Sequence, residues 1–230
     1  MAKGSPTNSL DGRAITLELA TRASQNAGMT VPFEETIAIL RVELEDIEPL
    51  IWRCIAVRTS MDLKTVHRVI QAAMGWLDCH LWEFTGNERK YGVLIPNDRD
   101  WNARIKNATT TKLSTLLATG VEEISYIYDI GDNWQHRIII EKLKSAELGT
   151  LYPQFLGGER RCPPEDCGGL PGYYDFLANI TSKQSKKRKA ALDWYGATYD
   201  PDEIDEQQIV ITLNRIAKAW RQGRSKAVKT

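Results

Sequence analysis

The chain has 230 residues, of which 42% are hydrophobic and 26% charged, proportions typical of a globular protein with a sizeable core. Its 30 basic and 30 acidic side chains cancel, so no overall field draws the chain onto DNA or an acidic membrane. This composition excludes a wholly disordered, collagen-like or disulfide-scaffold protein.

The apolar runs and the cysteines indicate the compartment. No apolar run approaches the roughly 18 residues that cross a bilayer, and the residues after Met1 lack the apolar core of a signal peptide. We therefore expect a cytoplasmic protein with no membrane partner. Cys54, Cys79, Cys162 and Cys167 are too few for a secreted scaffold and are expected to be reduced, although a Cys162–Cys167 disulfide stays open.

The first predicted elements are two strands and a helix. Residues 1–35 mix small polar and scattered apolar residues without a sustained period, which predicts a flexible leader. Alternating apolar residues then predict strands at 37–45 and 50–57, joined as a hairpin. From Asp62 the apolar spacing becomes helical, and this helix is expected to end at Gly75.

The middle of the chain is predicted to hold three more strands. An aromatic stretch at 81–92 is typical of one strand, and a polar loop and a short helix at 112–118 follow it. Residues 123–130 and 134–143 form the clearest strand pair, because apolar residues recur at even positions in both.

This strand pair has an expected register. If the even positions share one face, Ile130 opposes Trp134, and a three-residue turn at 131–133 joins the strands. Tyr126, Tyr128 and Trp134 could stack unpaired bases, but the isoleucines between them favour a place in the core.

Residues 153–172 are predicted to be a long loop, because glycine and proline recur throughout them. A connection of this length in a compact domain is usually functional or packed onto the core, and we expect it to lie across one edge of the sheet. Helices are predicted at 173–180, 186–195 and 203–222, followed by a basic tail at 223–230.

Together these elements predict a single α+β domain over residues 36–222. An antiparallel or mixed β-sheet would be packed with helices, and the long glycine- and proline-rich loop would lie against the sheet. No internal repeat is visible in the sequence.

Charge is distributed unevenly along the chain. From Thr181 onward there are eleven basic and six acidic residues, so this part is positive and residues 1–180 are negative to the same extent. A solvated helix face explains such a cluster, and a contact with nucleic acid is the sharper hypothesis. The candidate nucleic-acid-binding residues are Lys183, Lys186, Lys187, Arg188 and Lys189.

Four blocks of the sequence resemble a known family. The blocks are LRVELEDIEPLIWRCIAV, HRVIQAAMGWLDCHLWEF, YDIGDNWQHRIIIEKL and GGERRCPPEDCGGLPGYYDFL. In this order they resemble the plasmid pRiA4b ORF-3-like family over residues 36 to 210. The resemblance implies one α+β domain from a family found on plasmids, insertion elements and chromosomes, which includes insertion-element passenger proteins labelled TnpR. No serine-recombinase block is recognisable here, so the resolvase activity that this label suggests is not carried over, and the family implies no catalytic residue.

Two carboxylates and a histidine surround the turn of the predicted hairpin. Asp129, Asp132 and His136 could bind a metal or transfer protons. The alternation of faces separates Asp129 from His136, however, and this favours structural roles. In that interpretation Asp129 pairs across the strands with Arg137, and Asp132 braces the turn through its own backbone.

Glu165 and Asp166 lie between two prolines and two glycines in the long loop. Such a rigid setting either presents two carboxylates for binding or catalysis, or uses one of them to hold the loop closed or cap the next helix. With Asp129, Asp132 and His136 they are the candidate catalytic residues.

Thiols and imidazoles offer another possible metal site. Cys79, His80, Cys162 and Cys167 could together supply four zinc ligands, but no Cys-x-x-Cys motif joins them. Small buried thiols are therefore the default, and we expect no metal and no cofactor. His67 lies on the polar side of the predicted helix and is expected at the surface or in a hydrogen bond.

Three functional hypotheses stay open. The first is a non-catalytic accessory or binding module of plasmid or mobile-element biology that engages nucleic acid or a DNA-associated protein. The second is a metal-assisted hydrolase or nuclease that uses the carboxylates of residues 162–169, with at least three polar side chains converging between this loop and the hairpin. The third is a protein-interaction module with an exposed apolar patch. The sequence makes no prediction of oligomeric state.

Overall fold

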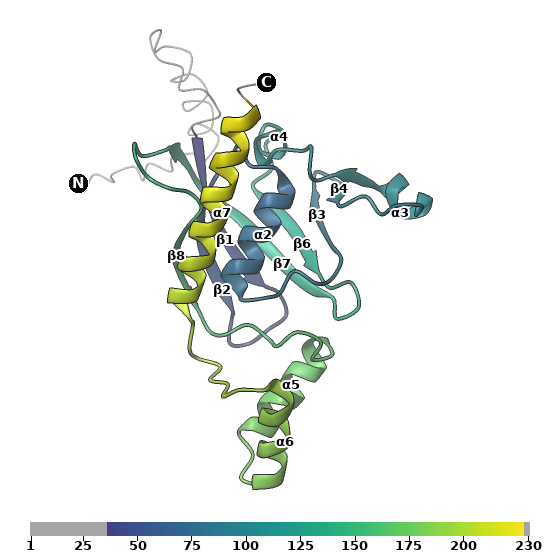
Figure 1. Cartoon of the computed structure of the whole chain (residues 1–230). Coiled ribbons are helices and arrows are strands. Elements are labelled where there is room, and N and C mark those ends of the chain that lie inside the picture. Colours follow the sequence, from purple (N-terminus) through teal and green to yellow (C-terminus); the bar gives the residue numbers. More distant parts are fainter. Residues whose placement is uncertain (1–35, 228–230) are drawn as a thin grey trace, which may run out of the picture. The chain divides into compact units, whose positions relative to one another are not determined.

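The alternating segments of the sequence form a single mixed sheet. The computed structural model describes residues 36–227, with side chains up to residue 223 (Figure 1). Neighbouring strands lie in the order β5-β4-β3-β6-β7-β1-β2-β8, and each pair is antiparallel except β4 and β5. The strands are β1 (Thr36–Leu44), β2 (Trp52–Arg58), β3 (Trp82–Gly86), β4 (Arg89–Gly92), β5 (Ile105–Asn107), β6 (Glu123–Tyr128), β7 (Trp134–Ser145) and β8 (Gln154–Glu159).

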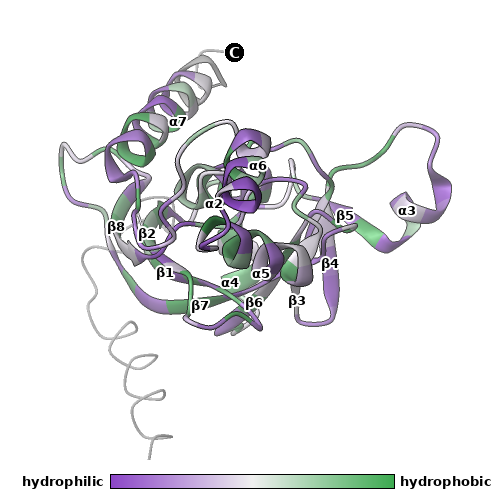
Figure 2. Ribbon diagram, turned by 90° about the horizontal axis from the view of Figure 1, so that it is seen from below, coloured by the Kyte–Doolittle hydropathy of each residue, from purple (hydrophilic) through white to green (hydrophobic). Residues whose placement is uncertain are grey.

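Helices accompany this sheet, so the prediction of one α+β domain is confirmed. Figure 1 shows α2 and α7 in front of the sheet, and α5 and α6 together below it. Figure 2 shows a run of hydrophilic residues in α6. The helices are α2 (Leu63–Met74), α3 (Arg99–Arg104), α4 (Leu113–Leu117), α5 (Gly169–Ile180), α6 (Ser185–Tyr195) and α7 (Glu206–Ala227).

The core lies between α2 and the sheet face that carries the even-numbered residues of β6 and β7. Tyr126, Tyr128 and Trp134 are at most 1% exposed and pack in one cluster with apolar residues of α2. This confirms that these aromatic residues belong to the core. Asp62 caps the start of α2 by accepting from the Thr65 N–H at 2.9 Å, because the first N–H groups of a helix lack partners within it.

The expected register of the β6–β7 hairpin is wrong by two residues. Tyr128 opposes Trp134, and Tyr126 opposes His136, so five residues, 129–133, connect the strands. A slip of two residues keeps every side chain on the same face, so the face pattern alone does not distinguish the two registers.

The segment 81–92 is two strands rather than one. β3 and β4 are joined by a tight turn in which Asn87 and Glu88 both have positive φ, 48° and 60°. The turn carries glutamate where glycine is the common residue, and so it lacks the usual sequence signal. The polar loop that follows also contains a short helix, α3, whose first turn is capped by Asp98.

The predicted loop at 153–172 begins as an edge strand. β8 pairs with β2, and Gly158 permits the close approach: a Cβ on Gly158 would lie 2.7 Å from the Trp52 carbonyl oxygen. Glycine therefore serves packing within a strand here, and not a turn. The loop that reaches the hairpin is residues 160–168, and α5 begins at Gly169, earlier than the predicted residue 173.

The ends of the chain are described in part. The expected leader, residues 1–35, lies outside the described residues, as do residues 228–230. Helix α7 continues to Ala227, beyond the predicted end at residue 222. Within the described part, no helix combines the length and the apolar character needed to cross a membrane.

Candidate functional site

The segment between α2 and β3 carries the central residue of the site, His80. Asp78 turns the chain with a left-handed φ of 56° and is anchored to α2 by two contacts. Its Oδ1 atom lies 2.6 Å from Nε2 of His67, and its backbone N–H donates to the Gln71 side chain at 3.0 Å. Helix α2 thus holds the short segment in which His80 lies.

His67 is buried and hydrogen-bonded, so its expected hydrogen bond is confirmed and the alternative of an exposed surface residue is excluded. Its Nδ1 atom lies 2.8 Å from the Tyr126 hydroxyl, and its ring stacks on Trp82 with centroids 4.0 Å apart. Burial lowers the pKa of His67, although its hydrogen bond to Asp78 opposes this effect.

The hairpin supplies the first carboxylate, Asp129, directly after β6. Its Oδ1 atom accepts from the backbone N–H groups of Gly131 and Asp132 at 2.9 and 3.3 Å. Its Oδ2 atom faces His80, 3.6 Å from Nε2. The expected pair with Arg137 is not formed, because Asp129 lies outside the ladder in a left-handed conformation, and Arg137 donates to Glu43 at 2.7 Å instead.

The long loop supplies the second carboxylate, Glu165. The indole N–H of Trp76 donates to the Pro163 carbonyl at 2.9 Å, which fixes the loop on the end of α2. Glu165 Oε1 accepts from the Leu77 N–H at 2.7 Å and from the Tyr128 hydroxyl at 3.0 Å. The other oxygen, Oε2, is therefore turned toward His80.

The loop and the hairpin are joined directly through Asp132. Its Oδ2 atom accepts from the Gly168 N–H at 3.1 Å, so it braces the loop and not its own turn, which corrects the expectation. A Cβ on Gly169 would lie only 2.7 Å from the Asp132 carbonyl oxygen. Glycine at this position permits the two segments to meet.

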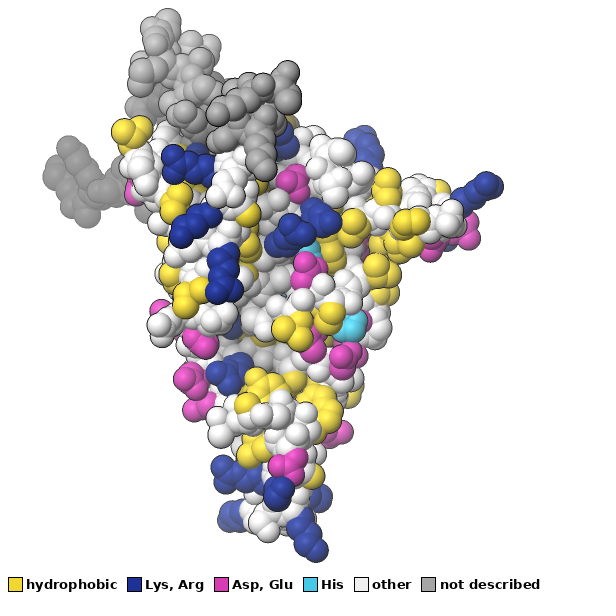
Figure 3. Space-filling model, in the orientation of Figure 1, with side chains coloured by type: hydrophobic (Ala, Val, Ile, Leu, Met, Phe, Trp, Pro, Cys, Tyr) yellow, Lys and Arg dark blue, Asp and Glu magenta, His cyan; other side chains and the backbone are white. Residues whose placement is uncertain are grey.

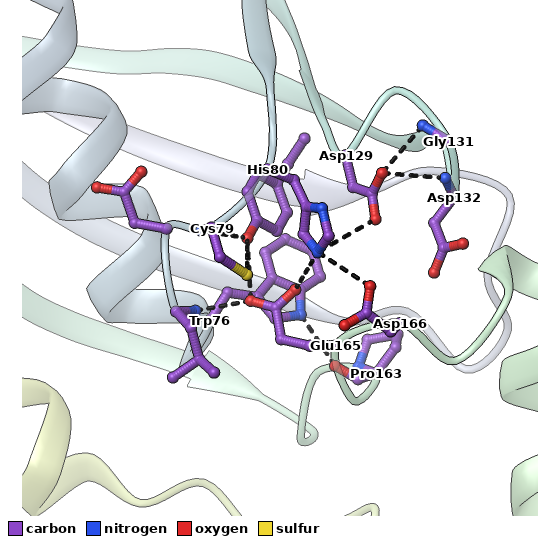
Figure 4. A network of polar contacts seen from close by, with 12 residues as sticks. Trp76, Cys79, His80, Asp129, Gly131, Asp132, Pro163, Glu165 and Asp166 are labelled. Atoms are coloured by element: carbon purple, nitrogen blue, oxygen red, sulfur yellow. Dashed lines mark hydrogen bonds and ion pairs between the residues drawn. The ribbon is translucent and has the colours of Figure 1, made fainter.

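Three carboxylates converge on a single nitrogen (Figure 4). His80 Nε2 lies 3.1 Å from Asp166 Oδ1, and Asp129 and Glu165 each place an oxygen within 4 Å of it. His80 Nε2 and Glu165 Oε2 are both buried atoms without a hydrogen-bond partner among the described residues. Two donors on a tetrahedral ion with bonds of about 2.1 Å stand about 3.4 Å apart, so these separations match the edges of a ligand shell.

The donor atoms fall into two groups that share His80. One group is His80, Asp129 and Asp166, and the other is Cys79, His80 and Glu165; within each, the atoms lie within 4.8 Å of one another. The Asp166 side chain is 71% exposed, so the first group is open to solvent on one side.

The structure thus unites part of the predicted site. Asp129, Glu165 and Asp166 come together as the hydrolase hypothesis requires, whereas His136 lies elsewhere in the core. Nδ1 of His136 contacts the Tyr126 carbonyl at 3.3 Å, and burial lowers its pKa to about 4. From the sequence, His80 is grouped with cysteines or with the other two histidines and not with carboxylates, because no local pattern links it to carboxylates 49 to 86 positions away.

The four-ligand zinc hypothesis is wrong as a set. Cys162 is buried beside Arg53 and Met74, and Cys167 lies near the Gly169 carbonyl. All four cysteines are free, so the Cys162–Cys167 disulfide is not formed. Only Cys79 stays close to His80.

A pocket of about 470 Å³ lies beside the same long loop and is lined in part by Pro163, Pro164 and Glu165. Its lining includes Trp76, Leu77 and Glu165, and also Trp194 of α6 and Ile204. This pocket is distinct from the centre at His80, because His80, Asp129 and Asp166 do not line it. Glu165 is common to both.

The candidate nucleic-acid-binding residues lie on or just before α6. This helix has no buried residue, and its basic side chains are exposed. Lys189 forms an ion pair with Asp193 at 2.6 Å. Figure 3 shows Lys and Arg side chains gathered at this end of the visible face.

Comparison with known proteins identifies relatives along most of the chain. Residues 36–208 match the family described as Plasmid pRiA4b ORF-3-like protein. The uncharacterized protein y4hQ of Sinorhizobium fredii is 33% identical over 193 residues, which covers 83% of this chain and 98% of that protein. A protein of unknown function from Methanosarcina mazei, MM3350, has a crystal structure similar to this fold with a TM-score of 0.67. It is 30% identical, and the match covers 75% of this chain and 97% of that one.

Proposed function

Because this chain belongs to the plasmid pRiA4b ORF-3-like family, whose two relatives above carry no functional name, we propose its function from the site itself. The protein is a hydrolase that depends on one divalent metal ion. His80, Asp129 and Asp166 bind the ion, and Glu165 acts as the general base. The observation that carries this proposal is the convergence of three carboxylates on the Nε2 atom of His80, which is buried and has no hydrogen-bond partner within residues 36–223.

The electrostatics support a bound cation. Three carboxylates around one imidazole leave an excess of negative charge, and such a cluster is stabilised by a positive ion. Asp129 and Glu165 each have one oxygen held by protein donors and the other directed at His80. Outer hydrogen bonds of this kind orient ligands in metal sites.

The solvent-exposed side of the group His80, Asp129 and Asp166 supports a catalytic metal site rather than a purely structural one. Three protein ligands leave positions for water, and catalytic sites keep such positions, whereas structural zinc sites are closed. Asp166 borders solvent, so a substrate has access to the ion. Glu165 Oε2 has no partner among the described residues and can accept a proton from a water on the ion.

Metal binding tests the first half of the proposal. We expect chelator-treated protein to bind one equivalent of Mn²⁺ in a calorimetric titration. Asp129→Asn and Asp166→Asn should each weaken binding at least tenfold, since each removes a charged ligand. Asp175→Asn, an exposed residue of α5, is the matched control and should bind as the parent does. Equal binding by all four proteins would overturn the proposal.

Hydrolysis tests the second half. With Mn²⁺ bound, the parent should hydrolyse bis-p-nitrophenyl phosphate or p-nitrophenyl acetate. Glu165→Gln should keep its metal and lose at least about 100-fold in rate, because the amide accepts no proton. Full activity of this variant would exclude Glu165 as the base, and no hydrolysis of either ester by the metal-loaded parent would count against the enzyme.

Binding of nucleic acid by α6 is the second candidate function, and one observation favours it. Lys186, Lys187 and Arg188 lie in the first turn of α6, where positive charge opposes the helix dipole and destabilises the helix. Exposed positive charges that destabilise the helix in which they lie are better explained by the binding of a negatively charged ligand than by a role in folding. In this proposal the protein acts in the cytoplasm with plasmid or insertion-element DNA, as TnpR-labelled relatives of the family suggest.

Salt dependence and charge removal test this candidate. Binding to a DNA duplex should weaken steeply between 50 and 200 mM salt, as phosphate contacts do. Lys186→Gln/Lys187→Gln/Arg188→Gln should reduce the affinity at least tenfold. The control Arg99→Gln/Arg104→Gln/Lys106→Gln removes the same charge from exposed positions on α3 and β5. An equal effect of both triple variants would show that overall charge, and not α6, is responsible.

A further inference from the structure

The geometry points to a second set of ligands that competes for His80 at the same centre. We propose that Cys79, His80 and Glu165 bind a sulfur-preferring ion such as Zn²⁺ or Co²⁺, and that this ion excludes the Mn²⁺ bound by His80, Asp129 and Asp166. The identity of the metal then decides whether the centre is active. This inference rests on the proposed function.

The Tyr128 hydroxyl organises the second set. It accepts from the Cys79 N–H at 3.2 Å and donates to Glu165 Oε1 at 3.0 Å, so one side chain positions both residues. Cys79 is exposed, and its Sγ atom lies 3.8 Å from the same hydroxyl. The sulfur, a ring nitrogen of His80 and a Glu165 oxygen all lie within 4.8 Å of one another, and His80 Nε2 is 3.8 Å from Glu165 Oε2.

Ligand chemistry separates the two sets. Thiolate with imidazole and carboxylate suits Zn²⁺ and Co²⁺, whereas two carboxylates with one imidazole suit Mn²⁺. A thiol must lose its proton to bind, so occupation of the second set releases one proton to solvent. No oxidation or reduction is involved.

Mutual exclusion follows from the shared histidine. The nitrogen that faces both Glu165 and Asp166 is His80 Nε2, which has one lone pair and can bind one ion at a time. An ion bound by the second set also binds Glu165, which is the general base in the proposed reaction. Zn²⁺ would therefore remove both a ligand and the base from the active arrangement, and inhibition is the expected result.

Cobalt reports directly on the sulfur ligand. Parent protein with Co²⁺ should show thiolate-to-cobalt charge-transfer absorption in the near ultraviolet, and Cys79→Ser should abolish it. Cys54→Ser is the matched control, because Cys54 is half-buried on β2 and outside both sets. A band that is absent from the parent, or that persists in Cys79→Ser, would overturn this inference.

Manganese separates this inference from the proposed function. Cys79→Ser should bind Mn²⁺ within about twofold of the parent, whereas Asp166→Asn should bind Mn²⁺ at least about tenfold more weakly and keep the cobalt–thiolate band. Zn²⁺ should displace Mn²⁺ from the parent, and Cys79→Ser should require at least tenfold more Zn²⁺. Mn²⁺ binding without a thiolate band would leave the proposed function and remove this inference. A thiolate band without Mn²⁺ binding would refute the proposed Mn²⁺ site. It would also refute the competition between the two ions, because there would be no Mn²⁺ to exclude.

Discussion

The three histidines show how strongly position decides the chemistry of one residue type. His67 is buried but has a partner at each ring nitrogen, and it anchors the segment before His80. His80 presents to the carboxylates a nitrogen that has no hydrogen-bond partner in the described part of the chain, which makes it a candidate ligand. His136 is buried in the core, and its Nε2 atom has no hydrogen-bond partner among the described residues, so its protonation in acid is expected to destabilise the fold.

Protonation of His136 is expected to destabilise the fold at low pH. The unfolded chain binds this proton near pH 6.5 and the folded chain only near pH 4, so stability falls as the pH drops through that interval. The shift corresponds to about 3 kcal/mol. His136→Asn keeps a donor for the Tyr126 carbonyl and cannot titrate, so it should lose about 3 kcal/mol less than the parent between pH 7 and pH 4 in urea unfolding. An equal acid loss in both proteins would refute the assignment.

Arg53 is a second residue whose role depends wholly on its surroundings. It is 2% exposed and has no carboxylate partner among its hydrogen bonds, yet its guanidinium N–H groups all have acceptors. It joins the end of α2 and the end of β8 to the loop that carries Glu165. The acceptors are the carbonyls of Trp52, Ala73, Glu159 and Arg160, and Cys162 Sγ.

Arg53→Lys should therefore be costly although it keeps the charge. An ammonium group has three donors and a shorter reach, so at least two buried acceptors lose their partners, at about 2–4 kcal/mol. Arg58→Lys, on the same strand but half-buried, is the control and should cost less than about 1 kcal/mol. Chemical denaturation measures the free energy of unfolding of both variants. Similar losses would show that the hydrogen bonds of the Arg53 guanidinium do not hold α2, β8 and the loop together.

At the scale of elements, the site depends on the junction of the β6–β7 hairpin with the loop after β8. The Asp132–Gly168 hydrogen bond and the close approach at Gly169 hold the two segments together. Asp129 belongs to one segment and Asp166 to the other, so the junction sets their separation. The prediction that the glycine- and proline-rich loop lies against the sheet is thus confirmed, and its contacts are with the β6–β7 hairpin.

A methyl group at the junction should separate the segments. Gly169→Ala introduces a Cβ 2.7 Å from the Asp132 carbonyl oxygen, in addition to the strain of a φ of 67°. Gly149→Ala is the control, because it has a φ of 80° and no atom within 4 Å of the new Cβ. We expect about 1 kcal/mol of destabilisation for the control, and a larger loss together with weaker Mn²⁺ binding for Gly169→Ala. Equal effects on stability and Mn²⁺ binding would show that the contact is not needed.

At the scale of the whole molecule, a metal ion at His80 would tie together three distant parts of the chain. His80 precedes β3, Asp129 follows β6, and Asp166 precedes α5. An ion bound only by the folded state must stabilise that state by mass action. Its effect should therefore appear in the unfolding of the entire domain.

Mn²⁺ at 100 times its dissociation constant should add about 2.7 kcal/mol of stability. For a domain of this size, that raises the midpoint of thermal unfolding by roughly 5–10 °C. A chelator should reverse the increase, and His80→Ala should show none. Calorimetry with and without the ion measures the midpoint of thermal unfolding. An equal increase of this midpoint in His80→Ala would show that the ion binds elsewhere.

The sequence by itself determined which residues face the core, where α2 begins and ends, and that one α+β domain forms, because alternation and helical spacing are local properties of the chain. It did not determine the register of the hairpin, because a shift of two residues leaves both faces unchanged. Nor did it determine the site: His80, Asp129 and Asp166 are distant in sequence and meet only when β6 pairs beside β3 and the loop after β8 docks on the hairpin. Contacts of that kind depend on the packing of the whole domain, and only the tertiary structure decided them.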